Sequence, residues 1–351
     1  MRQYLFQKQW MAINICLFIF ALVNPLHGDD GTKYTEYINA LENLQNKKFT
    51  NILIDELILY PHLFPDATNR DDMHFKMASI YAEKNEDLRS FIAHLEFIYL
   101  YPKSAHLTMA KDRVRTLIMQ KKKFKPLRDK IEKIINPSFT ESTKEYASYV
   151  FLKDLYNYHF EPATKLLIWN CEQFIANYPE SSKLDEVVYW KAELLRQDKQ
   201  YPRALTEYLK LTYLYDKSLY VTASKLKIAD LFSEKLKMHK NAILTLEEFL
   251  LEYPDDPQAA FAQFHMAQII EKEKKKYIEA INVYTAVAKN YPASVEAVPA
   301  LFAAARLYEK KFKEYDQAIR IYTEVVRDFK DDITAPYALA EAGRIYENKL
   351  K

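Results

Sequence analysis

Histidine and cysteine are the side chains of this protein that could carry out catalysis or hold a metal ion, and their spacing supports neither. The sequence contains no H-E-x-x-H pattern, which places two imidazoles on one face of a helix for zinc. It also lacks the G-x-S-x-G nucleophile elbow. Cys171 has no histidine close to it in the sequence and lies among apolar residues, so we expect a buried, inert thiol. We therefore expect no catalytic residues, no metal site and no cofactor.

Binding is the chemistry that the charged residues favour. The densest basic stretch consists of Lys121, Lys122, Lys123, Lys125 and Arg128. Such a cluster can attract an anionic partner at contact range, or it can be a solvated turn without a partner. The formal net charge is +2, and it falls to about zero if Arg2 and Lys8 are removed with a signal peptide. A neutral chain is not typical of a nucleic-acid binder.

Small residues recur at a constant step in the second half of the chain and predict a tandem repeat. Two columns with a spacing of 38 residues are Ala204, Ala242, Ala280 and Ala318, and Ala229, Ala267, Ala305 and Gly343. Units with this spacing present the same surface to each neighbour, so they are expected to stack. Small side chains at such positions are typical of helices that cross closely.

Each unit has the pattern of two amphipathic helices with a charged turn between them. Apolar residues recur at three- and four-residue steps on both helices. Aromatic-proline pairs are expected to end the second helix, because proline cannot continue it. These pairs are Tyr60-Pro61, Tyr101-Pro102, Tyr178-Pro179, Tyr253-Pro254 and Tyr291-Pro292. The residues two positions past each stop are expected to cap the next helix, and they are Ser104, Ser181, Ser218, Asp256, Ser294 and Asp332.

These columns resemble the tetratricopeptide repeat family, whose unit is about 34 residues long. The matching positions are Ala267, Ile270, Tyr277, Ala280, Tyr284 and Pro292, and in the next unit Ala305, Tyr308, Tyr315, Ala318 and Tyr322. The Y-P-x-S pattern is similar to the periplasmic repeats of outer-membrane barrel-assembly lipoproteins and Tol-Pal coordinator proteins. The resemblance implies an all-α fold, an α-α superhelix of about eight helix pairs with a C-terminal capping helix.

The chain is predicted to contain three regions. Residues 1–28 are expected to be a signal peptide, residues 29–140 degenerate helical repeats, and residues 141–351 a regular solenoid of the tetratricopeptide type with the capping helix. The chain has three glycines, which leaves no material for a glycine-rich phosphate loop or for many hairpin turns. Rossmann, P-loop and all-β folds are therefore excluded.

The N-terminal residues predict export. Arg2 and Lys8 precede an apolar run over residues 10–23, and a cleavage site is expected near Gly28. The run is shorter than the roughly 20 residues that span a bilayer. Cys16 lies inside the run, which argues against a lipid anchor at that residue. We expect a periplasmic protein, with association with the outer membrane left open.

The resemblance also implies a concave groove, lined by the first helix of each unit, that holds peptide segments of partner proteins. Three residues before the small column, the aromatic positions are Tyr189, Phe264 and Phe302. One and four residues after it, the polar positions are Glu193, Arg196, Asp230, Gln268, Glu271, Arg306, Glu309, Arg344 and Glu347. The alternative interpretation is that the aromatic residues belong to the core and that the charges are solvated surface.

Basic and acidic residues are also distributed unequally between the turns within helix pairs and the loops between pairs. Lysines collect in the turns within each helix pair, including the Lys121 stretch, whereas aspartates and glutamates collect in the loops between pairs. In a solenoid these connections lie on opposite edges, so we expect a basic edge and an acidic edge that could steer charged partners.

These features together predict a non-enzymatic scaffold or adaptor of the bacterial cell envelope. It would bind other proteins, in particular envelope or outer-membrane proteins, through the groove and the charged edges. Binding of nucleic acid is not expected, and both peripheral membrane association and the oligomeric state are left open. Two alternatives remain: a structural subunit of an outer-membrane protein assembly machine, and an envelope protein that binds a small ligand.

Overall fold

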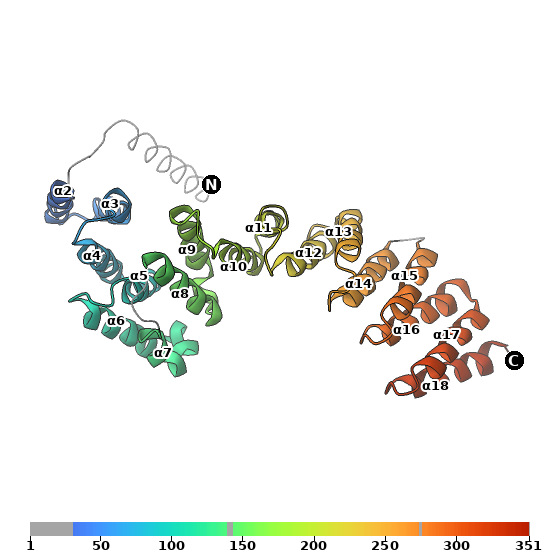
Figure 1. The fold of residues 1–351 in the computed structure, drawn as a ribbon. Helices are drawn as coiled ribbons and strands as arrows, with labels where there is room; N and C mark the ends of the chain where they lie inside the picture. Colours follow the sequence, from blue (N-terminus) through green and yellow to red (C-terminus); the bar gives the residue numbers. More distant parts are fainter. Residues whose placement is uncertain (1–30, 139–142, 274–275, 351) are drawn as a thin grey trace. The chain divides into compact units, whose positions relative to one another are not determined.

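The computed structural model describes residues 31–138, 143–273 and 276–350 (Figure 1). These residues form seventeen α-helices, α2 to α18, together with short 3-10 and π-helical turns, and they include no strand. The all-α prediction is confirmed, and the number of helices agrees with about eight pairs and one final helix. None of the described helices combines the length and the apolar character needed to cross a membrane. The predicted signal peptide, Cys16 and the Gly28 cleavage site lie outside the described residues.

The chain divides into two compact units between Ala163 and Thr164. The described helices of unit 1 are α2 (Thr32–Asn43), α3 (Thr50–Leu63), α4 (Arg70–Glu83), α5 (Asp87–Leu100), α6 (Leu107–Gln120), the 3-10 helix η1 (Lys122–Lys130), α7 (Ile131–Ile135), α8 (Lys144–Asn157) and the 3-10 turn η2 (Glu161–Ala163). Successive helices from α2 to α7 pack against one another, and α8 returns to pack on α5. This contact places the division after Ala163, beyond the predicted boundary at 140/141. The predicted difference in repeat regularity across that boundary remains a prediction.

Unit 2 is a stack in which every helix packs against the next one in the chain. Its helices are α9 (Thr164–Asn177), α10 (Leu184–Gln197), α11 (Tyr201–Leu214), α12 (Val221–Asp230), α13 (His239–Glu252), α14 (Ala259–Lys272), α15 (Tyr277–Asn290), α16 (Ala297–Leu307), α17 (Tyr315–Asp328) and α18 (Ala335–Ile345). The π-helical turns η3 (Leu231–Lys235), η4 (Tyr308–Phe312) and η5 (Tyr346–Leu350) extend α12, α16 and α18. Each 38-residue repeat therefore contributes one first helix and one second helix.

The alanine columns lie where these helices meet. Ala204, Ala242, Ala280 and Ala318 on the second helices have no exposed surface, and neither have Ala229, Ala267 and Ala305 on the first helices. Gly343 is the exception, because it is exposed and a Cβ atom built on it would meet no atom within 4 Å. The expectation of close packing is thus wrong at Gly343. In the preceding repeat α17 packs on α16, whereas the only described element after α18 is its own extension η5.

The predicted helix stops are confirmed in part. Tyr101, Tyr253 and Tyr291 directly follow α5, α13 and α15 as C-terminal caps. The Tyr60-Pro61 stop is wrong, because α3 continues to Leu63. Pro61 lies in the last turn of α3, so its missing N–H removes only one bond near the end of the helix.

The serine and aspartate residues after the stops are turn residues rather than helix caps. The hydroxyl of Ser218 accepts a hydrogen bond from the backbone N–H of Tyr220 at 3.2 Å, and α12 begins only at Val221. The same bond to the N–H two residues later is made by Ser104, Ser181, Asp256 and Asp332. These five side chains therefore close the turn that leads into the helix, whereas the buried hydroxyl of Ser294 has no hydrogen-bond partner among the described residues.

A buried ion pair joins the first three helices of unit 2. Lys191 on α10 is 8% exposed, and its Nζ lies 3.1 Å from Glu207 on α11 and 3.4 Å from Glu172 on α9. Lys191 directly precedes Ala192, and the residues that precede Ala229 and Ala267 are the buried Ile228 and Met266. At this position Lys191 substitutes a charged contact for the apolar packing of the later repeats.

Ionisable groups are also buried in unit 1. His74 Nε2 lies 3.1 Å from the carbonyl oxygen of Ala93 and 3.9 Å from a carboxylate oxygen of Glu96. Burial lowers the pKa of both His74 and His94 to about 4, and it raises the pKa of Glu96 to about 7. The two histidines are therefore neutral at neutral pH, where Glu96 is only partly ionised.

Acid is expected to destabilise unit 1 through these histidines. As the pH falls from about 6.5 to 4, His74 and His94 bind protons in the unfolded chain but not in the folded chain. This difference lowers the free energy of unfolding by about 3 kcal/mol for each histidine. Glu96 acts in the opposite direction, because its raised pKa costs stability as the pH rises from about 4.5 to 7. Glu96→Gln should therefore be close to the wild type at pH 4.5 and exceed it by about 3 kcal/mol at pH 7.5.

Hydrogen exchange of α4 and α5, corrected for the intrinsic exchange rate, measures this difference. Glu83→Gln is the matched control, because it removes an exposed carboxylate from α4. An equal gain for Glu96→Gln at both pH values would contradict the assigned shift.

Removing one partner of the ion pair in unit 2 should lower the free energy of unfolding more than replacing both partners by apolar residues. Lys191→Ala leaves Glu207 buried with only Lys210 as a partner, so we expect a loss of about 3 kcal/mol. The double variant Lys191→Met with Glu207→Leu restores apolar packing and should be within about 1 kcal/mol of the wild type or more stable. Urea unfolding measures both values. Lys210→Ala, which removes a more exposed partner of the same carboxylate, is the control and should cost less than about 1 kcal/mol.

Candidate functional site

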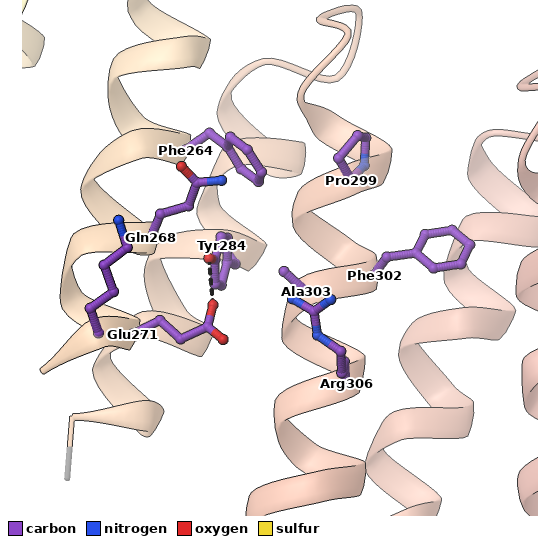
Figure 2. A pocket seen from close by; sticks show the side chains of 9 residues that line it. Phe264, Gln268, Glu271, Tyr284, Pro299, Phe302, Ala303 and Arg306 are labelled. Atoms are coloured by element: carbon purple, nitrogen blue, oxygen red, sulfur yellow. Dashed lines mark hydrogen bonds between the residues drawn. The ribbon is translucent and has the colours of Figure 1, made fainter. Parts of the chain in front are cut away.

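A pocket of about 600 Å3 lies against α14, α15 and α16 in unit 2 (Figure 2). Its wall contains five of the predicted groove residues, and these are Phe264, Gln268, Glu271, Phe302 and Arg306. The sequence analysis did not assign Lys272, Tyr284, Pro299 and Ala303 to the groove, although they also line it. Pockets of this volume can enclose a few side chains of a bound segment.

The repeat brings these residues together. Phe264, Gln268 and Glu271 follow one another at four- and three-residue steps on α14, so they share one face of the helix. Phe302 and Arg306 occupy the same positions one repeat later, on α16. Because the first helices are held in register by the buried alanines, equivalent faces lie along the same side of the stack.

Each groove aromatic also packs on a tyrosine of the second helix in its own repeat. The ring centroids of Phe264 and Tyr284 are 5.6 Å apart, and those of Phe302 and Tyr322 are 5.3 Å apart. In Figure 2 the ring of Phe302 turns away from the pocket that Phe264 faces. The groove and core interpretations therefore both apply, since these rings join the two helices of a repeat while part of their surface lines the groove.

The polar groups of the pocket differ in whether they already have a partner. The hydroxyl of Tyr284 donates a hydrogen bond to Glu271 at 2.7 Å (Figure 2). Burial and this bond to a carboxylate raise the pKa of Tyr284. Arg306 and Lys272 are exposed and form no ion pair with any residue that the structure describes. The pocket thus combines an aromatic wall with two cations that are free to bind an anionic group.

The remaining predicted groove residues lie elsewhere, and all of them except Glu347 are engaged within the protein. On α10, Tyr189 stacks on Tyr220 at 4.5 Å between ring centroids, while Glu193 accepts hydrogen bonds from Tyr208 and, at 2.6 Å, from Arg196. The polar groups on this face of the repeat are therefore largely bonded to neighbouring side chains of the protein.

Two further contacts run from one first helix to the next. Asp230 at the end of α12 lies 3.4 Å from His265 on α14. Glu309 accepts two hydrogen bonds of 2.9 Å from Arg344 of α18. Glu347 is exposed, with no ion pair among the residues described in the structure. These predicted residues line the stack, but they do not form one continuous binding site.

The predicted basic stretch is divided between paired and free lysines. Lys121 and Lys123 each place Nζ 3.3 Å from the same carboxylate oxygen of Asp87. Lys122 and Lys125 are exposed and form no ion pair with the described part of the chain. Among the four lysines of the stretch, these two keep a charge that no described carboxylate compensates.

Other members of the predicted basic edge help to shape turns. Arg128 donates hydrogen bonds to two carbonyl oxygens at the end of α6, at 3.2 and 2.8 Å, and so satisfies groups that the helix leaves free. Lys199 and Lys237 have positive φ values of 61° and 58° and close the turns within their helix pairs. Lys274 and Lys275 lie outside the described residues.

The site that comes nearest to a catalytic arrangement is the histidine group of unit 1. His94 is buried, and the side chain of His74 is 11% exposed. No group of three histidine, cysteine, aspartate or glutamate side chains among the described residues is placed to hold a metal ion. Cys171 is buried, and burial raises the pKa of its thiol.

Comparison with known proteins identifies the repeats. The tetratricopeptide repeat family model matches residues 223–256 and 299–332. No curated protein matches the chain. Among solved structures, the chain is similar to one described as a Podosopora anserina kinesin light chain with nearly identical TPR-like repeats, at 12% identity over 54% of this chain and 97% of that chain, with a TM-score of 0.39.

A second similar structure is the TPR domain of P58(IPK), at 17% identity over 91% of this chain and 89% of that chain, with a TM-score of 0.27. Since both TM-scores are low, the assignment rests on the family model and on the buried alanine columns. The matched segments contain Ala229, Ala242, Ala305 and Ala318 at equivalent positions. Residues 223–256 and 299–332 of this chain are therefore tetratricopeptide repeats.

Proposed function

We propose that the protein is a non-enzymatic adaptor of the bacterial cell envelope that binds other proteins through unit 2. Tetratricopeptide repeats generally mediate protein-protein interactions, and two such repeats lie in this unit. The observation that carries the proposal is the pocket between α14 and α16. There an aromatic wall lies beside Arg306 and Lys272, which have no carboxylate partner among the described residues.

The chemistry of the pocket favours one kind of partner segment. An apolar side chain of the partner can bury its surface against Phe264 and Tyr284, which gives affinity. An aspartate or glutamate beside it can pair with Arg306 or Lys272, which fixes orientation. We therefore assign the pocket to a segment that carries an apolar and an acidic residue close together.

The envelope location is supported by the sequence. The basic residues and apolar run at the N-terminus are typical of a secretory signal, and the Y-P-x-S pattern resembles that of periplasmic repeats. An exported adaptor that joins envelope proteins is the function most consistent with both features. A subunit of an outer-membrane assembly machine and an envelope ligand binder are the other outcomes that the experiment below distinguishes.

Photo-crosslinking in intact cells tests this function. A crosslinking amino acid at Gln268 should capture several envelope proteins, and Arg306→Glu in the same chain should lower the yield about 10-fold or more, because it replaces a charge-assisted contact by repulsion. Arg320→Glu on α17 is the matched control, since Arg320 is exposed and does not line the pocket.

The captured proteins separate the alternatives. One stoichiometric barrel protein would indicate an assembly-machine subunit, and capture of little protein would favour a ligand binder. Equal yields from Arg306→Glu and Arg320→Glu would show that the pocket is not the site. A chain found only in the cytoplasm would contradict the envelope role.

A further inference from the structure

Aliphatic side chains project into solvent at equivalent positions of successive loops in unit 2. Leu219 is 93% exposed, Val295 85% and Ile333 87%. Together with the exposed Pro257 they occupy one position of the repeat, at steps of 38 residues. We call Leu219, Pro257, Val295 and Ile333 the loop row. Each lies in the connection between the second helix of one pair and the first helix of the next.

The turn itself does not require an apolar residue at these positions. The structural contacts are made by neighbours, because Ser218 and Asp332 bond the backbone N–H two residues on, and Ala297 and Ala335 are the buried residues that begin α16 and α18. An equivalent connection in the same unit has the polar Ser182 after Ser181. The aliphatic side chains thus add nothing to the packing of the loops.

Other exposed apolar residues lie close to the loop row along the chain. Tyr213 and Leu214, in the last turn of α11, are 76% and 71% exposed, and Leu251 in the last turn of α13 is 83% exposed. Both turns lead directly into loops that carry a member of the loop row. Single exposed apolar residues are ordinary on a soluble protein, whereas a repeated position on a stack presents an ordered series of contacts.

The charges around the loop row are predominantly acidic. Residues 215–220, 253–258, 291–296 and 329–334 contain six acidic residues and two lysines, which gives a formal charge of −4. The lysines are Lys217 and Lys330, and the acidic residues are Asp216, Asp255, Asp256, Glu296, Asp331 and Asp332. Such a surface repels anionic lipid head groups and attracts basic side chains.

We propose that the loop row is a second docking surface of the protein, which binds a partner segment in which aliphatic side chains alternate with lysine or arginine. The aliphatic side chains of the partner cover the loop row, and its basic side chains pair with the acidic residues between the members of the row. The surface is separate from the pocket at α14 and α16, whose free charges are basic. Unit 2 therefore offers two sites of opposite charge preference.

The test uses the full chain and a labelled 16-residue synthetic peptide of alternating leucine, lysine and serine. Binding is measured by fluorescence anisotropy. The triple variant Leu219→Ser, Val295→Ser, Ile333→Ser should bind the peptide at least 10-fold more weakly. The matched control, Met119→Ser, Leu244→Ser, Leu339→Ser, removes three exposed apolar side chains from helices and should bind like the wild type. Because all six residues are exposed, both variants should keep the unfolding temperature of the wild type.

Two further peptides separate the contributions of charge and apolar contact. Peptides with glutamate in place of lysine, or serine in place of leucine, should each bind at least 10-fold more weakly than the parent peptide. Arg306→Glu should leave binding unchanged, so the outcome does not depend on the pocket function. Equal binding by the loop variant, loss of binding in Arg306→Glu, or binding to phosphatidylglycerol vesicles that the loop variant abolishes would each overturn the proposal.

Discussion

The close crossing of helices at buried alanines is the contact on which unit 2 depends. Ala204, Ala242, Ala280 and Ala318 meet the neighbouring helices with no exposed surface, as do Ala229, Ala267 and Ala305. A larger side chain at these positions would push the helix backbones apart. Because the same crossing recurs every 38 residues, each first helix presents the same positions to the same side, and this register defines both the groove and the loop row.

Regular geometry does not produce uniform chemistry along the groove. In the α10 repeat, Glu193 is held by Tyr208 and Arg196, and near the last helix Glu309 is held by Arg344. These contacts tie the helices together and leave few groups for a partner. The α14 to α16 pocket differs because Arg306 has no acidic neighbour that pairs with it among the described residues. The charged groups available to a partner are therefore local to this pocket and do not run along the whole groove.

The two kinds of connection use their polar residues differently. In the turns within helix pairs, lysines such as Lys199 and Lys237 adopt the left-handed conformation, so part of the predicted basic edge has a conformational role. In the loops that begin with Ser218 and Asp332, the oxygen side chain closes the turn, and the next residue is left in solvent. That division explains why Leu219 and Ile333 can be aliphatic without any contribution to folding, and hence available for binding.

The sequence by itself determined the helical class, the 38-residue register and the face on which Phe264, Gln268 and Arg306 lie, because each follows from local periodicity. It could not determine which charges pair, since the contact between Glu309 and Arg344 joins residues 35 positions apart. Nor could it show that Pro61 stays within α3, that Gly343 has no close neighbour or that α8 packs on α5. Only the tertiary structure decided these points, because side-chain pairing and solvent exposure depend on which helix packs next to which, and that is a property of the whole stack.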